Sequence, residues 1–167
     1  MKSKMKINEN ILAILIGTDG KKKIIRAKNI ITNVGDMFYA QKIVGEPPTH
    51  NFQNCVLGYG TAASHKAYCY AEFWEAIPDS EKAPEPGYPK RNDTDPDNTG
   101  AGLKVATYKY IWAGGDFNHA AISEGCITEP SPGDYSELLT RWLFEAPFAK
   151  TAEQVLVLFI NHDCLGV

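Results

Sequence analysis

The sequence predicts a mostly β protein, an antiparallel β-sandwich or jelly roll with one short helix and long loops. About eight short apolar segments follow one another, separated by turn residues roughly every ten positions, which is the pattern of such sandwiches. The chain contains 8 Tyr, 7 Phe and 3 Trp, and aromatic side chains pack well on strands. With 167 residues, 44% hydrophobic and 22% charged, the composition is that of one ordinary globular domain.

The first predicted element is a hairpin. The apolar run 11–16 and the segment 22–26, which contains Ile24 and Ile25, flank the pair Asp19-Gly20, and an Asp-Gly pair between such segments is a strong hairpin signal. Three lysines at 21–23 are expected to form its solvated tip, because short charge runs are common on surfaces.

The domain division follows from this hairpin. We expect residues 1–28 to form an N-terminal arm or hairpin and residues 29–167 to form a single β-sandwich domain. The apolar run at 11–16 is too short for a signal peptide, and no small-residue cleavage site follows it. No stretch approaches the length of a membrane span. A cytosol-like compartment and no membrane partner are therefore expected.

A short helix is expected over residues 35–44, where apolar side chains have roughly helical spacing and Asn33 caps the start. The two prolines that follow end it, because proline cannot continue a helix. Residues 55–59 are the next expected strand. Residues 68–76 fit either a helix or a strand, and their aromatic density favours a strand.

Residues 78–102 are expected to form a long loop, because they contain five prolines and four aspartates. Loops of this length in compact domains are usually functional or flexible. Clearer strand patterns follow at residues 104–112, 122–128, 138–145 and 154–161. The last of them is apolar on both faces, which predicts a buried central strand.

Charge and cysteine content exclude some classes of function. The net charge is -3, and no basic stripe suited to the phosphates of a nucleic acid is visible, so no nucleic-acid partner is expected. The four cysteines are scattered without paired spacing, and we interpret them as reduced thiols. They are Cys55, Cys69, Cys126 and Cys164.

The best metal candidate is the run of alternate carboxylates Asp93, Asp95 and Asp97. Oxygen ligands on alternate residues suit a hard cation such as calcium. The positions that should hold glycine and glutamate in a helix-loop-helix calcium site are Asn98 and Lys104 instead. The favoured interpretation is therefore a turn whose side chains bond their own backbone, and we assign no metal.

Two loose His–Cys pairs are candidates for a zinc site. His65 and Cys69 are four residues apart, and His162 and Cys164 are two apart. Zinc needs four ligands, or three and a water molecule, and neither pair has the spacing of a known motif. A Cys–His nucleophile pair at Cys164 lacks a supporting signature and lies close to the end of the chain.

No signature of an enzyme is present. The nucleophile elbow, the P-loop and the dinucleotide-binding glycine motif are all missing. Gly58 and Gly60 are expected to form a turn at the end of a strand. Glu124 and Glu145 are possible carboxylates for glycoside chemistry, but any two acids would satisfy that argument. We predict no enzyme, no catalytic residue and no cofactor.

The tryptophans leave one alternative open, since an exposed indole can stack on a sugar. Trp112 and Trp142 sit within alternating runs and are expected in the core. Trp74 fits either role.

Several segments resemble tailed-bacteriophage virion proteins. The resemblance covers most of the chain from residue 29 onward and rests on turn motifs. The matching segments are NIITNVGD (29–36), LGYGTAA (57–63), YPKRNDTD (88–95), NTGAG (98–102) and FAKTA (148–152).

The resemblance implies a capsid cement, or decoration, protein. Such proteins are jelly-roll or sandwich domains, commonly trimeric, that clamp the major capsid protein lattice on the outer surface of the virion. The resemblance also implies that the protein is synthesised in the host cytoplasm. The hairpin within residues 1–28 departs from the pattern and is expected to serve docking or trimer contact. The residues that contact the capsid are not identified by the sequence.

Two other functions stay open. The first is a tail-fibre or receptor-adhesion component, because similar motifs occur in tail-fibre proteins. The second is a small β-sandwich carbohydrate-binding or hydrolase module.

Overall fold

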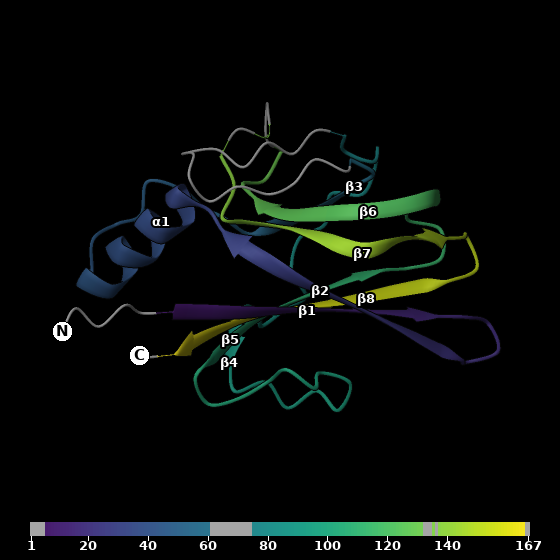
Figure 1. Cartoon of the computed structure of the whole chain (residues 1–167), viewed down its shortest axis with the longest axis horizontal. Coiled ribbons are helices and arrows are strands. Elements are labelled where there is room, and N and C mark those ends of the chain that lie inside the picture. Colours follow the sequence, from purple (N-terminus) through teal and green to yellow (C-terminus); the bar gives the residue numbers. More distant parts are fainter. Residues whose placement is uncertain (1–5, 61–74, 132–134, 136, 166–167) are drawn as a thin grey trace.

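The computed structural model describes residues 6–60, 75–131, 135 and 137–165. These residues are mostly antiparallel β-structure with one helix, so the predicted fold class is confirmed (Figure 1). The elements are β1 (Lys6–Ile16), β2 (Lys22–Ile31), α1 (Asn33–Val44), β3 (Asn54–Gly58), β4 (Lys90–Arg91), β5 (Val105–Trp112), β6 (His119–Thr128), β7 (Thr140–Lys150) and β8 (Val155–Leu165).

The strands of the described residues form one antiparallel sheet in the order β3-β6-β7-β2-β1-β8-β5-β4. Strand twist accumulates across a sheet, and this sheet curls into a half-barrel (Figure 1). The β3-β6-β7 part therefore faces the β1-β8-β5 part across a shared interior. A single curled sheet thus produces the two-layer packing of a sandwich.

The N-terminal hairpin belongs to the centre of this sheet. Residues 6–28 form the predicted β1–β2 hairpin, but they are not an arm beside the domain, because β1 also pairs with β8 from Lys6 to Ile16. The physical reason lies in the side chains of β1, which are apolar on both faces: Ile11, Ala13 and Leu15 on one, Leu12 and Ile14 on the other. Only a central strand buries both faces.

The helix α1 begins at Asn33, two residues before the expected start, and its cap lies one residue before the one we expected. Thr32, and not Asn33, is the N-cap, and its hydroxyl accepts a hydrogen bond from the Gly35 amide at 2.9 Å. A side chain at Gly35 would collide with the Leu139 carbonyl, so glycine allows α1 to lie close to the backbone just before β7. The helix ends at Gly45, whose φ of 75° suits glycine.

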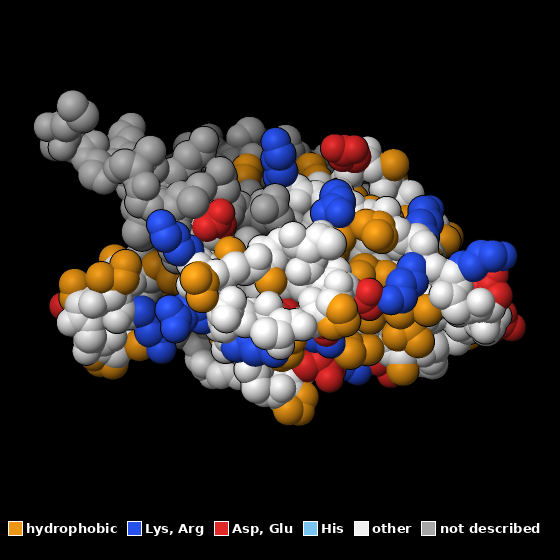
Figure 2. All heavy atoms as spheres, turned by 90° about the horizontal axis from the view of Figure 1, so that it is seen from below, with side chains coloured by type: hydrophobic (Ala, Val, Ile, Leu, Met, Phe, Trp, Pro, Cys, Tyr) orange, Lys and Arg blue, Asp and Glu red, His pale blue; other side chains and the backbone are white. Residues whose placement is uncertain are grey.

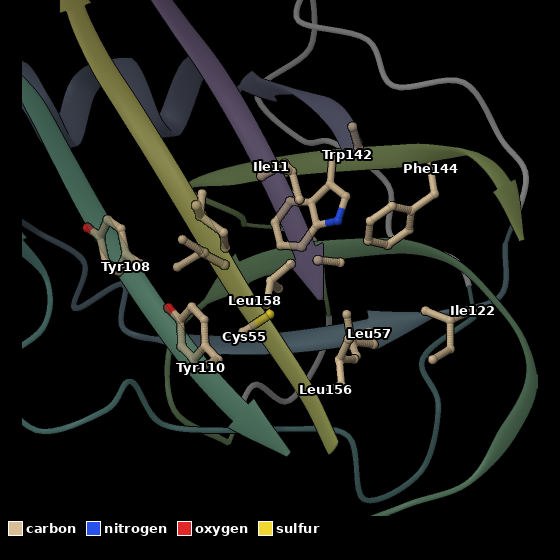
Figure 3. Close-up of a cluster of buried hydrophobic side chains, with 14 of the residues drawn as sticks. Ile11, Cys55, Leu57, Tyr108, Tyr110, Ile122, Trp142, Phe144, Leu156 and Leu158 are labelled. Atoms are coloured by element: carbon tan, nitrogen blue, oxygen red, sulfur yellow. The ribbon is translucent and has the colours of Figure 1, made fainter. Parts of the chain in front are cut away.

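The main core fills the interior of the half-barrel, as Figure 3 shows for side chains from β1, β3, β5, β6, β7 and β8 pointing toward one another. Trp112 and Trp142 are both fully buried there, as predicted. The Trp112 indole donates to the Ser80 carbonyl at 2.8 Å. The predicted central strand at residues 154–161 is confirmed as β8, between β1 and β5.

A smaller outer cluster of Leu12, Ile14 and Phe159 lies on the opposite face of the sheet. Paired residues project on the same side, so Lys109, Phe159, Leu12 and Arg26 form one row across β5, β8, β1 and β2. The segment 92–102, here called the outer loop, spans this row. Its residue Asp95 bonds Lys109 at one end and Thr99 bonds Arg26 at the other.

The predicted long loop at 78–102 is therefore only partly a loop. Lys82 exchanges both backbone hydrogen bonds with Cys55, at 2.9 and 2.8 Å. Lys90–Arg91 form the short edge strand β4 against β5. Because these contacts fix both the start and the middle of the segment, the loop is held along its length.

Candidate functional site: a pocket of aromatic and basic residues

A cavity with a volume of about 530 Å³ lies between α1, residues 48–53, residues 84–91 and β5. We call it the aromatic–basic pocket. Five rings and three prolines form its walls. These residues are Phe38, Tyr39, Phe52, Tyr88, Tyr108, Pro48, Pro84 and Pro89. Its volume is within the usual range for ligand sites.

The charged groups of the pocket are all basic. Lys42, Lys90 and Arg91 line it together with His50, and no Asp or Glu belongs to its described lining. Lys90 is paired with Asp93 at 3.0 Å. Lys42 stands 5.6 Å from the Phe38 ring centre. Among the described residues, Lys42 and Arg91 form no ion pair, so the pocket has a positive potential in a chain of net charge -3.

The walls are held by contacts with one another. Phe38 and Phe52 meet edge to face at 5.5 Å, and His50 stacks on Phe52 at 5.0 Å. The Tyr88 hydroxyl donates to Asp93 at 2.9 Å, while the Lys90 ammonium lies 4.5 Å from the Tyr88 ring centre. The pocket is therefore formed before any ligand binds.

The floor of the pocket is uncharged at neutral pH. Tyr39 hydrogen-bonds Nδ1 of His162, and the Tyr108 ring lies 5.4 Å from the His162 ring. Burial lowers the pKa of His162 to about 3, so the imidazole stays neutral. Burial also raises the pKa of Tyr108 to about 12, against the opposing hydrogen bond with Tyr39. These groups support the site and do not exchange protons near pH 7.

The other side of His50 has acidic neighbours. Its Nδ1 lies 3.5 Å from a Glu129 carboxylate oxygen and 3.6 Å from one of Glu137. The positive potential is consequently concentrated on the side of Lys42 and Arg91.

The carboxylates weighed as calcium ligands each bind a different lysine. Asp93 pairs with Lys90 at 3.0 Å, Asp95 with Lys109 at 2.7 Å, and Asp97 with Lys22 at 2.7 Å. Within the described part of the chain, no three His, Cys, Asp or Glu residues are grouped as metal ligands. The calcium hypothesis gains no support from this geometry, in which the carboxylates tie the outer loop to the sheet.

Asp93 also belongs to a buried polar network. Its second oxygen accepts from the Asn98 amide at 2.9 Å, and Asn98 and Asn161 exchange side-chain hydrogen bonds at 3.0 and 2.9 Å. Thr107 donates to Asn161 at 2.7 Å. Burial would raise the pKa of Asp93, but the bonds from Asn98, Lys90 and Tyr88 outweigh it and hold the pKa at about 2.

The zinc and thiol candidates are not assembled into a site. His65 and Cys69 lie outside the described residues, as does the side chain of Cys164. Cys55 and Cys126 are free and buried, and burial raises the pKa of both. They sit on adjacent strands but belong to clusters on opposite faces of the sheet, so their side chains point apart.

The two glutamates weighed for glycoside chemistry differ in burial. Glu124 is fully buried, pairs with Arg141 at 2.5 Å and accepts from the Gly60 amide at 2.9 Å. Glu145 is exposed on β7. Gly60 follows the end of β3, and the residues after it, where the predicted turn would continue, lie outside the described part of the chain. Glu124 belongs to an internal ion pair that the sequence did not predict.

The pocket itself was missed by the sequence interpretation. Its residues come from four segments that are distant in the chain, and no motif joins them. The tyrosine and prolines at 84–91 can be seen in the sequence, but only the fold brings them to α1.

A scan against protein-family models and searches of the curated proteins and of the solved structures found no match. In the part of the chain that the structure describes, no helix has the length and hydrophobicity needed to span a membrane.

Proposed function

We propose that the chain is a non-enzymatic virion structural protein that docks through α1 on the major capsid protein lattice and stabilises the shell as a cement protein. The observation that carries the proposal is the apolar outer face of α1. Met37, Ile43 and Val44 are 45%, 68% and 67% exposed, on a helix that buries only Val34, Gly35 and Phe38. The resemblance of several segments to tailed-phage virion proteins supports the choice of partner.

The outer face of α1 offers energy for association. Burying one large aliphatic side chain contributes about 1.5–3 kcal/mol, and α1 exposes three such side chains, of which Met37 and Val44 lie on the same side of the helix, two turns apart. Figure 2 shows hydrophobic side chains gathered on the lobe at the left, where Figure 1 places α1, with Lys and Arg side chains beside them. A helix face of this kind fits an apolar groove on a partner.

A cement role also sets an expectation for the assembly. Three copies around a lattice junction would make heterologous contacts that close into a ring. We propose this homotrimer on the capsid surface, after synthesis in the host cytoplasm.

The alternatives have less support. Trp112 and Trp142 are both buried, which removes two of the three indoles from any sugar-binding role. A tail-fibre role would use the same helix face on a different partner.

The test is cosedimentation of the purified chain with expanded, tailless capsids. We expect saturable binding at fixed stoichiometry and a higher melting temperature of the shell. The double variant Ile43→Lys, Val44→Lys should weaken binding at least tenfold. Leu103→Lys is the matched control, because Leu103 is also 68% exposed but lies in the loop before β5.

Circular dichroism and thermal melting of each variant establish that the fold is unchanged. The proposal is wrong if the unmodified chain does not bind capsids, or if the α1 variant and the Leu103 control bind equally well.

A further inference from the structure

We infer that the aromatic–basic pocket binds an acidic, extended peptide segment of the partner on which α1 docks. This inference rests on the proposed function and adds to it the chemistry of the segment. The pocket contains what such a segment needs: cations without counterions, flat apolar walls and a position next to the docking helix.

The cations of the pocket favour a negatively charged ligand. Arg91 and Lys42 form no ion pair among the described residues, whereas Lys90 is already paired with Asp93. A guanidinium can hold a carboxylate through two parallel hydrogen bonds. No Asp or Glu belongs to the described lining, and the nearby Glu129 and Asp93 already contact His50 and Lys90, so an incoming carboxylate is attracted most strongly by Lys42 and Arg91, beside aromatic walls that exclude water.

The walls select a ligand that also has apolar surface. Phe38, Phe52 and Tyr88 present rings whose positions are fixed by edge contacts and by the Tyr88–Asp93 hydrogen bond. Preformed walls lower the ordering cost of binding. A bare inorganic anion would use the cations and leave these rings without a contact.

The position of the pocket favours a peptide over a free metabolite. Phe38, Tyr39 and Lys42 project into it from α1, the same helix that exposes Ile43 and Val44. Ile43 lies one helical turn after Tyr39, so a partner that covers Ile43 lies next to a residue of the pocket lining. At the other end lies β4, the last strand of the sheet, so an extended chain can leave the pocket along an open edge.

The test uses the full chain and a fluorescently labelled peptide, Glu-Glu-Glu-Tyr-Glu-Glu-Glu, titrated by anisotropy. We expect saturable binding that weakens as salt is raised. The double variant Lys42→Ala, Arg91→Ala should weaken it at least tenfold. The control Lys28→Ala, Lys104→Ala removes two exposed lysines outside the pocket and should change binding less than twofold.

Three outcomes overturn the inference. The first is no binding of the peptide, and the second is an equal loss in the control variant. The third is complete competition by citrate at a concentration equal to that of the peptide, which would make the pocket a site for free anions.

Capsid cosedimentation separates this inference from the proposed function. If the Ile43, Val44 variant loses capsid binding but the Lys42, Arg91 variant binds capsids normally, the cement function stands and the acidic-segment inference falls. If the peptide binds through Lys42 and Arg91 but the unmodified chain binds no capsid, the pocket stands as an acidic-peptide site and the cement function falls.

Discussion

The two faces of the curled sheet are stabilised in different ways. The inner face buries a continuous apolar core that includes Trp112 and Trp142. The outer face has two small clusters, one around Leu12 and Phe159 and one of Val56, Cys126 and Leu138, and the outer loop is held over the first by ion pairs and an asparagine network. The inner face thus depends on shape and area, whereas the outer face depends on specific polar partners.

This difference indicates which face of the sheet loses stability when pH or salt is changed. Apolar burial is insensitive to both, but exposed ion pairs are screened by salt, and buried titratable groups link stability to pH. The following changes test the comparison, from the largest expected effect to the smallest.

Trp142→Ala should cost about 3–5 kcal/mol of unfolding free energy, because it leaves a cavity in the inner core. Trp142 is fully buried, and its ring lies against Gly125, where no side chain would fit. Urea denaturation measures the loss, which should not vary with salt. A cost below about 1 kcal/mol would show that the inner face does not depend on close packing.

His162→Gln should remove most of the acid sensitivity of the inner face. The folded-state pKa of His162 is about 3, below its ordinary value of 6.5, so unfolding takes up a proton and stability falls as the pH drops below 6.5. Between pH 7 and pH 4 the loss should be about 3 kcal/mol, at about 1.4 kcal/mol per pH unit. Chemical denaturation at each pH should give a flatter profile for the variant than for the unmodified chain.

Asp93→Asn should lower the free energy of unfolding by about 2 kcal/mol at neutral pH, because it weakens the polar contacts of the outer face. The pKa of Asp93 is about 2 in the folded chain against an ordinary 3.8, so its contribution is complete above pH 3.8 and disappears as the pH falls through 2. The unmodified chain and the variant should converge in denaturant midpoint near pH 2. A constant difference down to that pH would contradict the assignment.

The smallest effect is expected at the Lys22–Asp97 pair, whose side chains are 45% and 39% exposed. A double-mutant cycle to alanine should give a coupling of roughly 0.2–1 kcal/mol that decreases with salt. The Lys109–Asp95 pair, with exposures of 18% and 19%, is the matched comparison and should couple more strongly. Equal coupling in both pairs would mean that burial does not control their strength.

Local patterns in the sequence predicted much of the fold. The Asp19-Gly20 turn and the two apolar runs around it predicted the β1–β2 hairpin, since a hairpin depends on neighbouring residues. The alternation at 104–112 likewise predicted β5. The place of β1 in the sheet could not be predicted in this way, because its second partner β8 comes from the other end of the chain and no local signal joins them.

The buried charges escaped prediction for a related reason. Lys150 resembles an ordinary strand-end lysine, but its ammonium donates to the carbonyls of Ala113 and Phe117 at 3.0 Å and of Gly114 at 3.3 Å. Glu124 likewise finds Arg141 only across the β6–β7 pairing. The candidate pocket is an extreme case, because its cations matter only in relation to rings from other segments.

The pairing of β1 with β8 also sets the order of events when the chain is made. On a ribosome, β1 emerges first and can form its hairpin with β2, but its other edge stays open until β8 follows. β5 also cannot join β1 at this stage, because in the described sheet β8 lies between them and pairs with both. Such long-range pairing slows folding, and the half-finished sheet exposes an apolar edge to neighbouring chains. The nascent protein is therefore vulnerable to aggregation until β8 has emerged and paired with β1 and β5.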